Sequence, residues 1–541
     1  MTMKKKILVA LLLTITISYS CVGCGQTQDP TESSQDEQST TDESPNDEIV
    51  IDPNATISPY YKAPSEEDVN EDASDADDSI DSTANNSDGY INATVYNEAN
   101  TDDFSDTQIE FYDPTTNEAV LERVNRNVYV ATYGSDSNEG TEEAPFRTIQ
   151  KALDVVSPGY TVYIKSGIYS GKNIFTNSGT EEAKITVAAM PLQDVVVTLG
   201  YGESGAIFDI NGQSNICIRE LRIGYSRSDW VYGVYMHGGE HNITVTDNDI
   251  CNLATYNRSG YGYGGAYAVL MYGQGPDEET AIDNVSIDNN RIYTIETGNC
   301  EAVAASGNVS NIAINSNIIF DIMNIGIDIY GNADYCTNPA LDQPRNVEIN
   351  SNTVYNCVSD NYAVAGIYID GARDTNISDN VIYENMYGVI VASEHRDDNY
   401  PVTNISVNNN KIHDNHDGGI AFGGYDTTLA GLVTDSEIIG NIMYHNGLIA
   451  NDGWNGEISV EKCSNITISD NEIIAHDYKY PVISSQVSID FVKNVTFTNN
   501  LYQTPYPENI RFRFAGEYYT GLDNWNKAMN ASDISSKSAT K

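Results

Sequence analysis

Apolar and polar residues alternate in short segments that return roughly every thirty residues between positions 240 and 500. Asn242–Asn248 reads NITVTDN, and Asn404–Asn410 reads NISVNNN. Similar segments occupy 284–290, 311–317, 346–352, 374–380, 465–471 and 494–500, and a less regular one occupies 435–441. Such alternation is typical of a β-strand with one buried face, and the fixed period predicts an all-β solenoid.

Each period contains a second short strand, such as Gly326–Tyr330 or Gly366–Asp370. Two or three strands per period, with no helical spacing between them, predict one coil of a parallel β-helix, which climbs roughly 4.8 Å per coil. Equivalent residues then stack on one another. We expect the last asparagine of each segment to point inward in a structural ladder. Its members are Asn248, Asn290, Asn317, Asn352, Asn380, Asn410, Asn441, Asn471 and Asn500.

The start of the repeated region predicts a short helix. Ile149, Ala152 and Leu153 have helical spacing, and such a helix would cover the open first coil. Segments 128–140 (VYVATYGSDSNEG) and 144–154 (APFRTIQKALD) resemble the opening of bacterial right-handed parallel β-helix proteins. That carbohydrate-active superfamily includes pectate lyases, other polysaccharide lyases and glycosidases. The resemblance covers about 127–503, implies a right-handed parallel β-helix and leaves the reaction open. We expect the β-helix domain at 127–530, with 531–541 as a C-terminal tail.

The first residues predict export. Lys4–Lys6 precede an apolar run, Ile7–Ile17, as in a secretory signal. The run leads to Cys21-Val-Gly-Cys24, which resembles a bacterial lipoprotein cleavage box and implies a signal peptide at 1–24. We favour Cys24 as the lipidated residue, with Cys21 or an ordinary secretion signal as alternatives. The expected location is extracytoplasmic, with a lipid anchor as the only membrane contact.

Residues 25–120 are rich in acidic and small polar residues, which predicts a disordered linker. The formal net charge of −50 argues against binding to nucleic acid, whose phosphates attract basic surfaces. It also disfavours strongly anionic polysaccharides unless calcium bridges the two. We expect a monomer whose partner is a polysaccharide or an oligosaccharide.

Alternation also predicts which side chains lie on the outside of the second strand. In Gly-Ile-x-Ile-x the isoleucines point inward and the other two positions outward. The expected outward pairs are Tyr235 and His237, Leu270 and Tyr272, Val303 and Ala305, Asp328 and Tyr330, Tyr368 and Asp370, Ile390 and Ala392, Ala421 and Gly423, and Ser459 and Glu461. Those expected to contact sugar, together with His395, are Tyr235, His237, Tyr272, Tyr330, Tyr368 and Glu461. Tyrosine suits this role because it offers a flat apolar face and a polar tip.

Three carboxylates, Asp328, Asp370 and Glu394, fall on successive coils of this face. Glycoside hydrolysis needs one carboxyl group as acid and another as nucleophile or base. Adjacent coils place Asp370 and Glu394 roughly 5–8 Å apart, which leaves retention and inversion both open. Crowding by Asp328 should raise one carboxyl pKa, as a general acid requires. We therefore predict these three as catalytic residues, and a hydrolase of this kind requires no cofactor.

Gly366-Ile-Tyr-Ile-Asp370 and Glu394-His395 are similar to the site of a parallel β-helix family of retaining β-xylosidases. The resemblance implies that Asp370 is the nucleophile and Glu394 the acid/base. The sequence departs from that family directly after Asp370, where Gly371–Asp374 lacks the family's bulky residues.

Two other functions stay open. Gly456–Ser464 (GEISVEKCS) resembles a strand of chondroitinase-B-like and alginate lyases, which implies Lys462 as a base and calcium as a partner of the substrate. The next coil lacks the arginine of those lyases, since 486–491 reads QVSIDF. The other possibility is a surface protein that binds glycans without turnover. Metal ligands stay unknown: His413, His416 and Asp417 have suitable side chains, but they fall at a turn.

Overall fold

The computed structural model describes residues 95–96, 108–112, 119–123 and 127–536, except 259–262, 361, 397–398, 425, 448–453 and 475–479. The predicted signal peptide, the lipidation site Cys24, most of the predicted linker and residues 537–541 lie outside the described residues. Among those described, no helix is long and apolar enough to cross a membrane.

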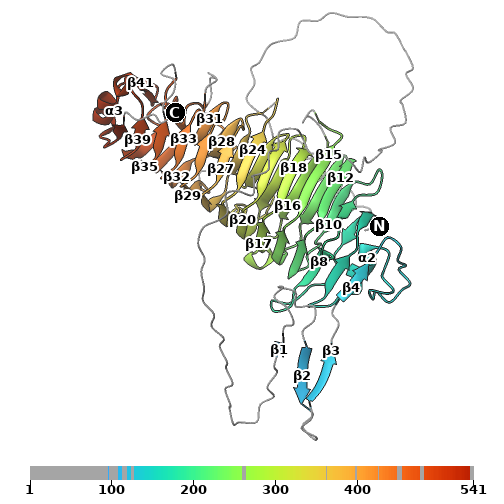
Figure 1. Ribbon diagram of the computed structural model, residues 1–541. Helices are drawn as coiled ribbons and strands as arrows, with labels where there is room; N and C mark the ends of the chain where they lie inside the picture. The colour runs from blue at the N-terminus through green and yellow to red at the C-terminus, as the bar shows by residue number, and fades with distance from the viewer. Residues whose placement is uncertain are drawn as a thin grey trace, which may run out of the picture. The chain divides into compact units, whose positions relative to one another are not determined.

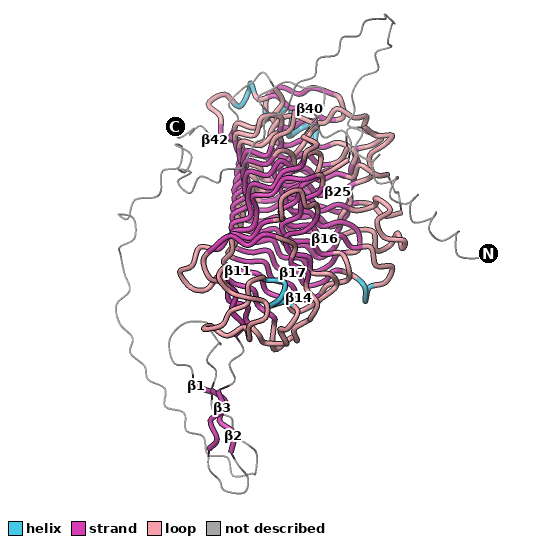
Figure 2. Tube along the Cα trace, turned by 90° about the vertical axis from the view of Figure 1, so that its right-hand side faces the viewer, coloured by secondary structure: helices cyan, strands magenta, loops and turns pink. Residues whose placement is uncertain are grey.

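Three sheets of 13 strands each wind through the described part of 127–536 as a parallel β-helix (Figures 1 and 2). The predicted fold class is confirmed. Sheet 1 carries the repeated segments and consists of β4 (Asn127–Val130), β5 (Thr161–Ile164), β8 (Ile185–Ala189), β11 (Ile216–Arg219), β14 (His241–Thr246), β17 (Ile282–Asp288), β20 (Val309–Asn315), β23 (Arg345–Asn350), β26 (Arg373–Ser378), β29 (Val402–Asn408), β32 (Val433–Ile439), β35 (Cys463–Ser469) and β38 (Val492–Thr498).

Sheet 2 follows sheet 1 in each coil. It consists of β6 (Gly167–Ser170), β9 (Val195–Thr198), β12 (Arg222–Ser228), β15 (Asp249–Thr255), β18 (Arg291–Glu296), β21 (Ile318–Ile322), β24 (Thr353–Cys357), β27 (Val381–Tyr383), β30 (Lys411–His413), β33 (Ile442–Tyr444), β36 (Glu472–Ile474), β39 (Leu501–Gln503) and β42 (Ile534–Ser536).

Sheet 3 contains the predicted outward carboxylates. It consists of β7 (Asn173–Ile174), β10 (Gly205–Asp209), β13 (Trp230–Met236), β16 (Gly265–Gly273), β19 (Glu301–Gly307), β22 (Ile325–Tyr330), β25 (Ala365–Asp370), β28 (Tyr387–Ala392), β31 (Gly418–Phe422), β34 (Ile458–Val460), β37 (Ile483–Ser484), β40 (Arg511–Phe514) and β41 (Glu517–Thr520). Its last pair, β40 and β41, is antiparallel.

The repeated segment owes its polar ends to backbone geometry. Its first and sixth residues have positive φ, for example 56° at Asn404 and 55° at Asn409. Asn and Asp tolerate this left-handed conformation better than other non-glycine residues. The same conformation recurs at Asn242, Asp247, Asn284, Asn289, Asn311, Ser316, Asn346, Ser351, Asp374, Asp379, Asp435, Gly440, Asn465, Asp470, Asn494 and Asn499.

The seventh residue of each segment forms the predicted inward ladder, which the structure confirms. In one rung, Asn380 Nδ2 donates to Asn410 Oδ1 at 2.9 Å and to the Ile349 carbonyl at 2.9 Å. The ladder ends on the buried carboxylate of Asp533, which accepts from the backbone N–H and from Nδ2 of Asn500 at 3.0 and 2.9 Å.

A second, shorter ladder was not predicted. Asn385, Asn415 and Asn446 stack at another corner of the coil, and Asn446 Nδ2 donates to Glu457 Oε2 at 2.6 Å. Both ladders therefore end on a buried carboxyl group, which supplies the acceptor that the last amide needs.

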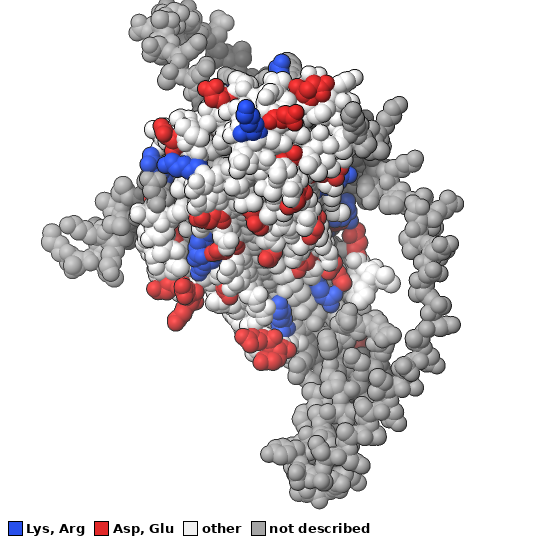
Figure 3. Space-filling model, turned by 90° about the vertical axis from the view of Figure 1, so that its left-hand side faces the viewer, with Lys and Arg blue, Asp and Glu red and all other residues white. Residues whose placement is uncertain are grey.

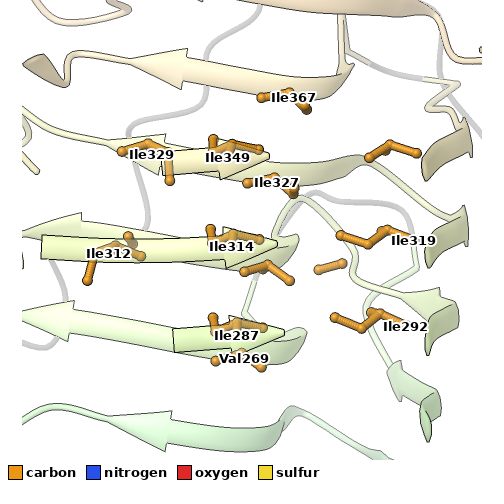
Figure 4. Close-up of a cluster of buried hydrophobic side chains, with 14 of the residues drawn as sticks. Val269, Ile287, Ile292, Ile312, Ile314, Ile319, Ile327, Ile329, Ile349 and Ile367 are labelled. Atoms are coloured by element: carbon orange, nitrogen blue, oxygen red, sulfur yellow. The ribbon is translucent and has the colours of Figure 1, made fainter. Parts of the chain in front are cut away.

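The core is a set of stacked aliphatic columns inside the three sheets. Ile314 pairs in register with Ile287 on one side and with Ile349 on the other, and Figure 4 shows these side chains one above another. Burial of such columns provides the main favourable free energy of a fold of this kind.

Both ends of the coil stack are covered. Helix α2 (Ile149–Leu153) buries the three predicted residues, Ile149, Ala152 and Leu153, against the first coils, so the predicted capping helix is confirmed. At the other end, helix α3 (Leu522–Met529) buries Trp525, whose Nε1 donates to Asp533 Oδ2 at 3.1 Å. Two 3-10 turns, η3 (Glu278–Thr280) and η4 (Pro507–Asn509), lie in connections.

The C-terminal boundary differs from the prediction. Residues 531–536 were expected in a tail, but they contain β42, which pairs in parallel with β39. Their alternation is too short to be recognised from sequence. Within the acidic stretch, β1 (Val95–Tyr96), β2 (Gln108–Tyr112) and β3 (Ala119–Arg123) form a separate three-stranded sheet that was not predicted.

The surface of the described residues agrees with the acidic composition. Figure 3 shows Asp and Glu side chains scattered over one face, with few Lys and Arg among them. Such a surface offers no basic patch to nucleic acid on that face.

Candidate active site

Strand register decides which side chains lie on the outer face of sheet 3. Paired positions in successive coils are Tyr235, Leu270, Ala304, Asp328, Tyr368, Ile390, Ala421 and Ser459. The next outward row includes Tyr272, Ser306 and Tyr330, and it ends with the pair Asp370 and Ala392.

One predicted pair was wrong. Val303 and Ala305 lie in the core, whereas Ala304 and Ser306 are the residues in register with Asp328 and Tyr330. Ala302 in β19 takes the place that Gly326 has in β22. Counting the alternation of β19 from Ala302 would have placed Ala304 and Ser306 on the outer face. The outer face of β19 therefore carries two small side chains beside the carboxylates.

Four carboxyl groups come together on this face. Asp328 lies in β22, Asp370 is the last residue of β25, and Glu394 follows β28. All three interact electrostatically with one another and with Glu301, the first residue of β19. The structure thus unites the three predicted catalytic residues and adds Glu301, which sequence reasoning missed. Glu301 could have been found because the residue directly before the Ala-Val pair, like the residue before a Gly-Ile pair, also has an outward side chain.

Burial raises the pKa of every carboxyl group in this cluster. Burial and the neighbouring carboxyl groups raise the pKa values of Asp328 and Asp370 well above their usual range. Burial and Glu394 raise the pKa of Glu301 to about 8. Glu394 keeps solvent exposure, but the protein atoms around it displace enough water to raise its pKa to about 6. None of the principal interactions that shift these values comes from Lys or Arg.

The two buried aspartates, Asp328 and Asp370, differ in their hydrogen bonds. The backbone N–H of Glu394 donates to Asp370 Oδ1 at 2.7 Å, which favours the ionised form of Asp370 but does not outweigh burial. Asp328 Oδ1 is buried and has no hydrogen-bond partner among the described residues, and the residue as a whole is 4% exposed. An unpaired buried oxygen disfavours the charged form, because nothing replaces the lost water.

Tyr330 and His395 lie beside the carboxyl groups. Tyr330 Oη and His395 Nε2 share a hydrogen bond of 2.7 Å. Burial lowers the pKa of His395, so that the neutral ring predominates near pH 7. Tyr368 is buried, and burial together with Asp370 raises its pKa well above the usual range. Three predicted sugar contacts therefore lie near the predicted catalytic residues.

The other predicted aromatic contacts lie on earlier coils. Tyr235 stacks on His237 with ring centroids 4.5 Å apart, and a hydrogen bond of 3.0 Å to Asp209 raises the pKa of His237. Tyr272 meets the edge of Tyr335 at 5.1 Å, and Tyr335 meets Tyr330 at 5.5 Å.

Glu461 is not a surface contact, contrary to prediction. Its side chain is fully buried, and Oε2 accepts from the backbone N–H groups of Gln486 and Val487 at 2.9 and 3.1 Å. The carboxylate therefore holds the turn of the next coil. Lys462 is also buried, with its ammonium group donating to the Ala430 carbonyl at 2.6 Å.

No group of three or more His, Cys, Asp and Glu side chains in the described part of the chain has an arrangement that could hold a metal ion. Carboxylate oxygens are the ligands that calcium prefers. Calcium therefore stays a prediction, to which the described residues contribute no assembled site.

Comparison with protein families accounts for most of the β-helix. A family model described as "Pel9A-like, right handed beta helix region" matches residues 128–294. A second, "Right handed beta helix region", matches residues 340–528. The chain belongs to the right-handed parallel β-helix superfamily with the pectate-lyase-like fold.

Curated relatives of this β-helix protein include the uncharacterized protein YwoF of Bacillus subtilis (strain 168). It is 29% identical over 424 residues, which span 74% of this chain and 85% of YwoF. Pectate lyase PEL9 of Emericella nidulans is 37% identical over 73 residues, 13% of this chain and 18% of that lyase.

Solved structures similar to this chain have low sequence identity to it. The complex of XylC with xylose is 12% identical, with a TM-score of 0.48 over 77% of this chain and 87% of that chain. The A-module of the mannuronan C-5 epimerase AlgE6 of Azotobacter vinelandii is 14% identical, with a TM-score of 0.47 over 72% of this chain and 93% of that chain.

Proposed function

We propose that this protein is a glycoside hydrolase that cleaves neutral oligo- or polysaccharides with Asp370 and Glu394. The observation that carries the proposal is the cluster of Glu301, Asp328, Asp370 and Glu394, whose raised pKa values provide protonated carboxyl groups near neutral pH. Glycoside hydrolysis needs a protonated and an ionised carboxyl group at one site. The main electrostatic partners of these groups include no cation to bind a uronate, which favours a neutral sugar.

The protonation states bear on the two roles. Burial raises the pKa of Glu394 to about 6 and raises the pKa of Asp370 well above its usual range. The resemblance to β-xylosidases implies Asp370 as the ionised nucleophile and Glu394 as the acid/base. The N–H donated by Glu394 to Asp370 supports that assignment, since a hydrogen bond stabilises the carboxylate. Mass spectrometry after reaction with a 2-fluoroglycoside would show which carboxyl group forms the covalent bond in a retaining mechanism.

A second candidate is β-elimination on a uronide. The hydrogen-bonded pair Tyr330 and His395 favours it, because either side chain can move a proton beside the carboxyl cluster. In a lyase this pair would act as the base in place of Lys462. The ammonium group of Lys462 is buried and donates to the Ala430 carbonyl, which argues against its role as the base. A lyase would also need calcium to balance the carboxylates of protein and substrate.

One assay separates these functions. The mature protein is incubated with neutral and uronic glycans, with and without chelator, while reducing ends and the absorbance of unsaturated uronides are followed. The hydrolase proposal expects new reducing ends without that absorbance. Calcium-dependent absorbance would instead establish a lyase. Retained binding without any product would leave a glycan-binding surface protein.

The proposal places the enzyme outside the cytoplasm, anchored through a lipid on Cys24. Its support is the apolar run and the cysteine pair in the sequence. Metabolic labelling with a fatty-acid analogue should modify the wild-type protein and the Cys21→Ala variant, but not Cys24→Ala. The opposite pattern would assign the lipid to Cys21.

A further inference from the structure

The outer face of sheet 3 is closed on the C-terminal side of the carboxyl cluster. Outward residues of β22, β25, β28 and β31 form a second apolar cluster apart from the core. Its buried members are Ile325, Val364, Ala365, Tyr368, Tyr387, Ile390, Ala392, Ala421 and Trp454, with Tyr362 and Met386 packed against them. A solvated face would leave such residues accessible, whereas Ile390 is 0% and Ala421 1% exposed.

Trp454 anchors this apolar cover. Its Nε1 donates to the Gly423 carbonyl at 2.8 Å, and its own carbonyl accepts from the Tyr387 hydroxyl at 3.2 Å. The rings of Tyr387 and Trp454 meet edge to face at 5.6 Å. Because Tyr368 belongs to this cluster and also interacts with Asp328, Asp370 and Glu394, the cover begins directly beside the carboxyl groups.

Aromatic rings limit the face on the N-terminal side. The side chains of Trp230, Tyr232, Tyr235 and His237 stack in sequence along β13, so their row runs across the sheet. Ring centroids are 6.2, 4.6 and 4.5 Å apart, with interplanar angles of 7°, 14° and 21°. Stacked rings shield one another's faces, so the row presents its edges rather than a flat platform.

Only a short part of the outer face of sheet 3 lies between the aromatic row on β13 and the apolar cover. Four strand spacings separate β13 from β25, which is about 19 Å between backbones. The middle strand, β19, carries the small residues Ala304 and Ser306 beside Asp328 and Glu301. Tyr335 contacts both Tyr272 and Tyr330, so it bridges part of this space.

We propose that the site binds the end of an oligosaccharide chain and cannot hold a polymer laid along the helix axis. The aromatic row on β13 ends the binding site on the N-terminal side, and the apolar cover anchored by Trp454 ends it on the C-terminal side. This inference rests on the proposed hydrolase function, and it adds that cleavage occurs at chain ends. A chain end fits because the carboxyl groups lie directly against the cover, with no room for further sugar units beyond them.

The first test uses neutral oligosaccharides of increasing length, labelled at the reducing end, and the matching polymer. The expected result is a single small product from every length at early conversion, with polymer viscosity unchanged. A mixture of lengths from the start, with a rapid fall in viscosity, would overturn the inference while leaving the hydrolase proposal intact.

A second measurement does not depend on turnover. Calorimetry with the Asp370→Asn variant compares affinities for the same oligosaccharides. We expect affinity to stop rising after the first few sugar units, because the limits exclude further contacts. An affinity that rises steadily with chain length overturns the inference, and absence of binding at every length overturns it together with the proposed function.

Variants of the two limits sharpen the result. Trp454→Ala should release longer products as well, because it opens the closed side, and Trp454→Phe should restore the single product. Tyr235→Ala provides an independent variant at the opposite limit, should Trp454→Ala fail to fold. Tyr201→Ala serves as control, since this 97% exposed ring belongs to neither limit. An unchanged product in both Trp454→Ala and Tyr235→Ala would overturn the inference.

Discussion

The outer faces of sheets 2 and 3 are both rich in aromatic residues, but they use them differently. On sheet 2, one ring from each of six successive coils forms a ladder with centroids 4.7–5.2 Å apart and interplanar angles of 2–8°. Its members are Tyr293, Phe320, Tyr355, Tyr383, His413 and Tyr444. On sheet 3 the rings meet at varied angles and lie beside four carboxyl groups. On sheet 2 the rings in the middle of the ladder are covered on both faces by the rings of the neighbouring coils. On sheet 3 the stacking is irregular, and the aromatic and carboxyl side chains can contact a ligand.

Buried polar groups differ in the same way. The amide of Asn380 in the inward ladder has one partner in the next coil and one in the coil before, but Asp328 Oδ1 has none among the described residues. In this solenoid the repeated positions stabilise the fold, and the candidate chemistry lies where the repetition stops. Four predictions test that division, from the largest expected effect to the smallest.

Asp370→Asn and Glu394→Gln should each lower kcat by about a thousandfold or more, because a carboxyl group of a glycosidase takes part in both bond breaking and proton transfer. Thermal unfolding should change little. Steady-state kinetics on the substrate found in the glycan assay provides the measurement. Glu348→Gln, at an exposed carboxylate of sheet 1, is the matched control and should keep full activity. Near-normal activity in either site variant would remove the carboxyl pair from the mechanism.

Asn410→Ala should lower the free energy of unfolding by about 3 kcal/mol, because it removes buried side-chain hydrogen bonds. Asn410 Oδ1 accepts from the backbone N–H and from Nδ2 of Asn380, and Asn410 Nδ2 donates to the Ile377 carbonyl. Guanidinium denaturation measures the change. Asn408 is the last residue of β29, two residues before Asn410, and its side chain donates to Asn376 instead of joining the inward ladder. Asn408→Ala should cost less than about 1 kcal/mol. Equal losses in the two variants would mean that the ladder contributes nothing specific.

Stability should fall as pH rises from about 4.5 to about 8. The pKa of Glu301 is raised to about 8 in the folded protein, so its contribution is complete below its ordinary pKa and disappears as the folded carboxyl group ionises. Glu301→Gln should remove on the order of 2 kcal/mol of this decline, allowing for partial solvent screening. Denaturation at a series of pH values measures the slope. A slope identical to that of the wild type would show that Glu301 ionises normally.

Tyr355→Ala should have the smallest effect, a loss of about 1 kcal/mol in stability with kcat unchanged. Its ring stacks between Phe320 and Tyr383 at 5.0 and 4.9 Å but remains partly exposed. Denaturation and the glycan assay on one preparation give both numbers. A marked loss of activity would contradict the division between the two faces.

Much of the fold could be predicted because the determining signals are local and repeated. Alternating apolar and polar residues predict the strands, and their thirty-residue period predicts the solenoid. The positive φ at residues such as Asn404 explains why asparagine begins most of the repeated segments. The carboxyl cluster could be predicted in part, since Asp328, Asp370 and Glu394 follow from counting within their own coils. Glu301 was missed because it precedes the Ala-Val pair of β19, and the outward pair of that strand was miscounted by one position.

Other features depend on contacts between distant segments. The cover over Tyr368 comes from Trp454, far along the chain, and no periodicity predicts it. Glu461 has the correct outward alternation, yet the backbone of Gln486 and Val487 folds over it. Alternation predicts the side of a sheet on which a residue lies, but it does not predict what later coils place above that residue.

Asp533 bears on whether two molecules can stack end to end. Between side chains, each asparagine of the inward ladder accepts from the coil before it and donates to the coil after it, so the ladder has a polarity. Asp533 accepts from Asn500 and, once ionised, has no proton to pass on to another molecule. The antiparallel pair β40 and β41 likewise interrupts the parallel edge of sheet 3. A second molecule therefore cannot continue the asparagine ladder or the parallel pairing of sheet 3, and both features disfavour end-to-end association.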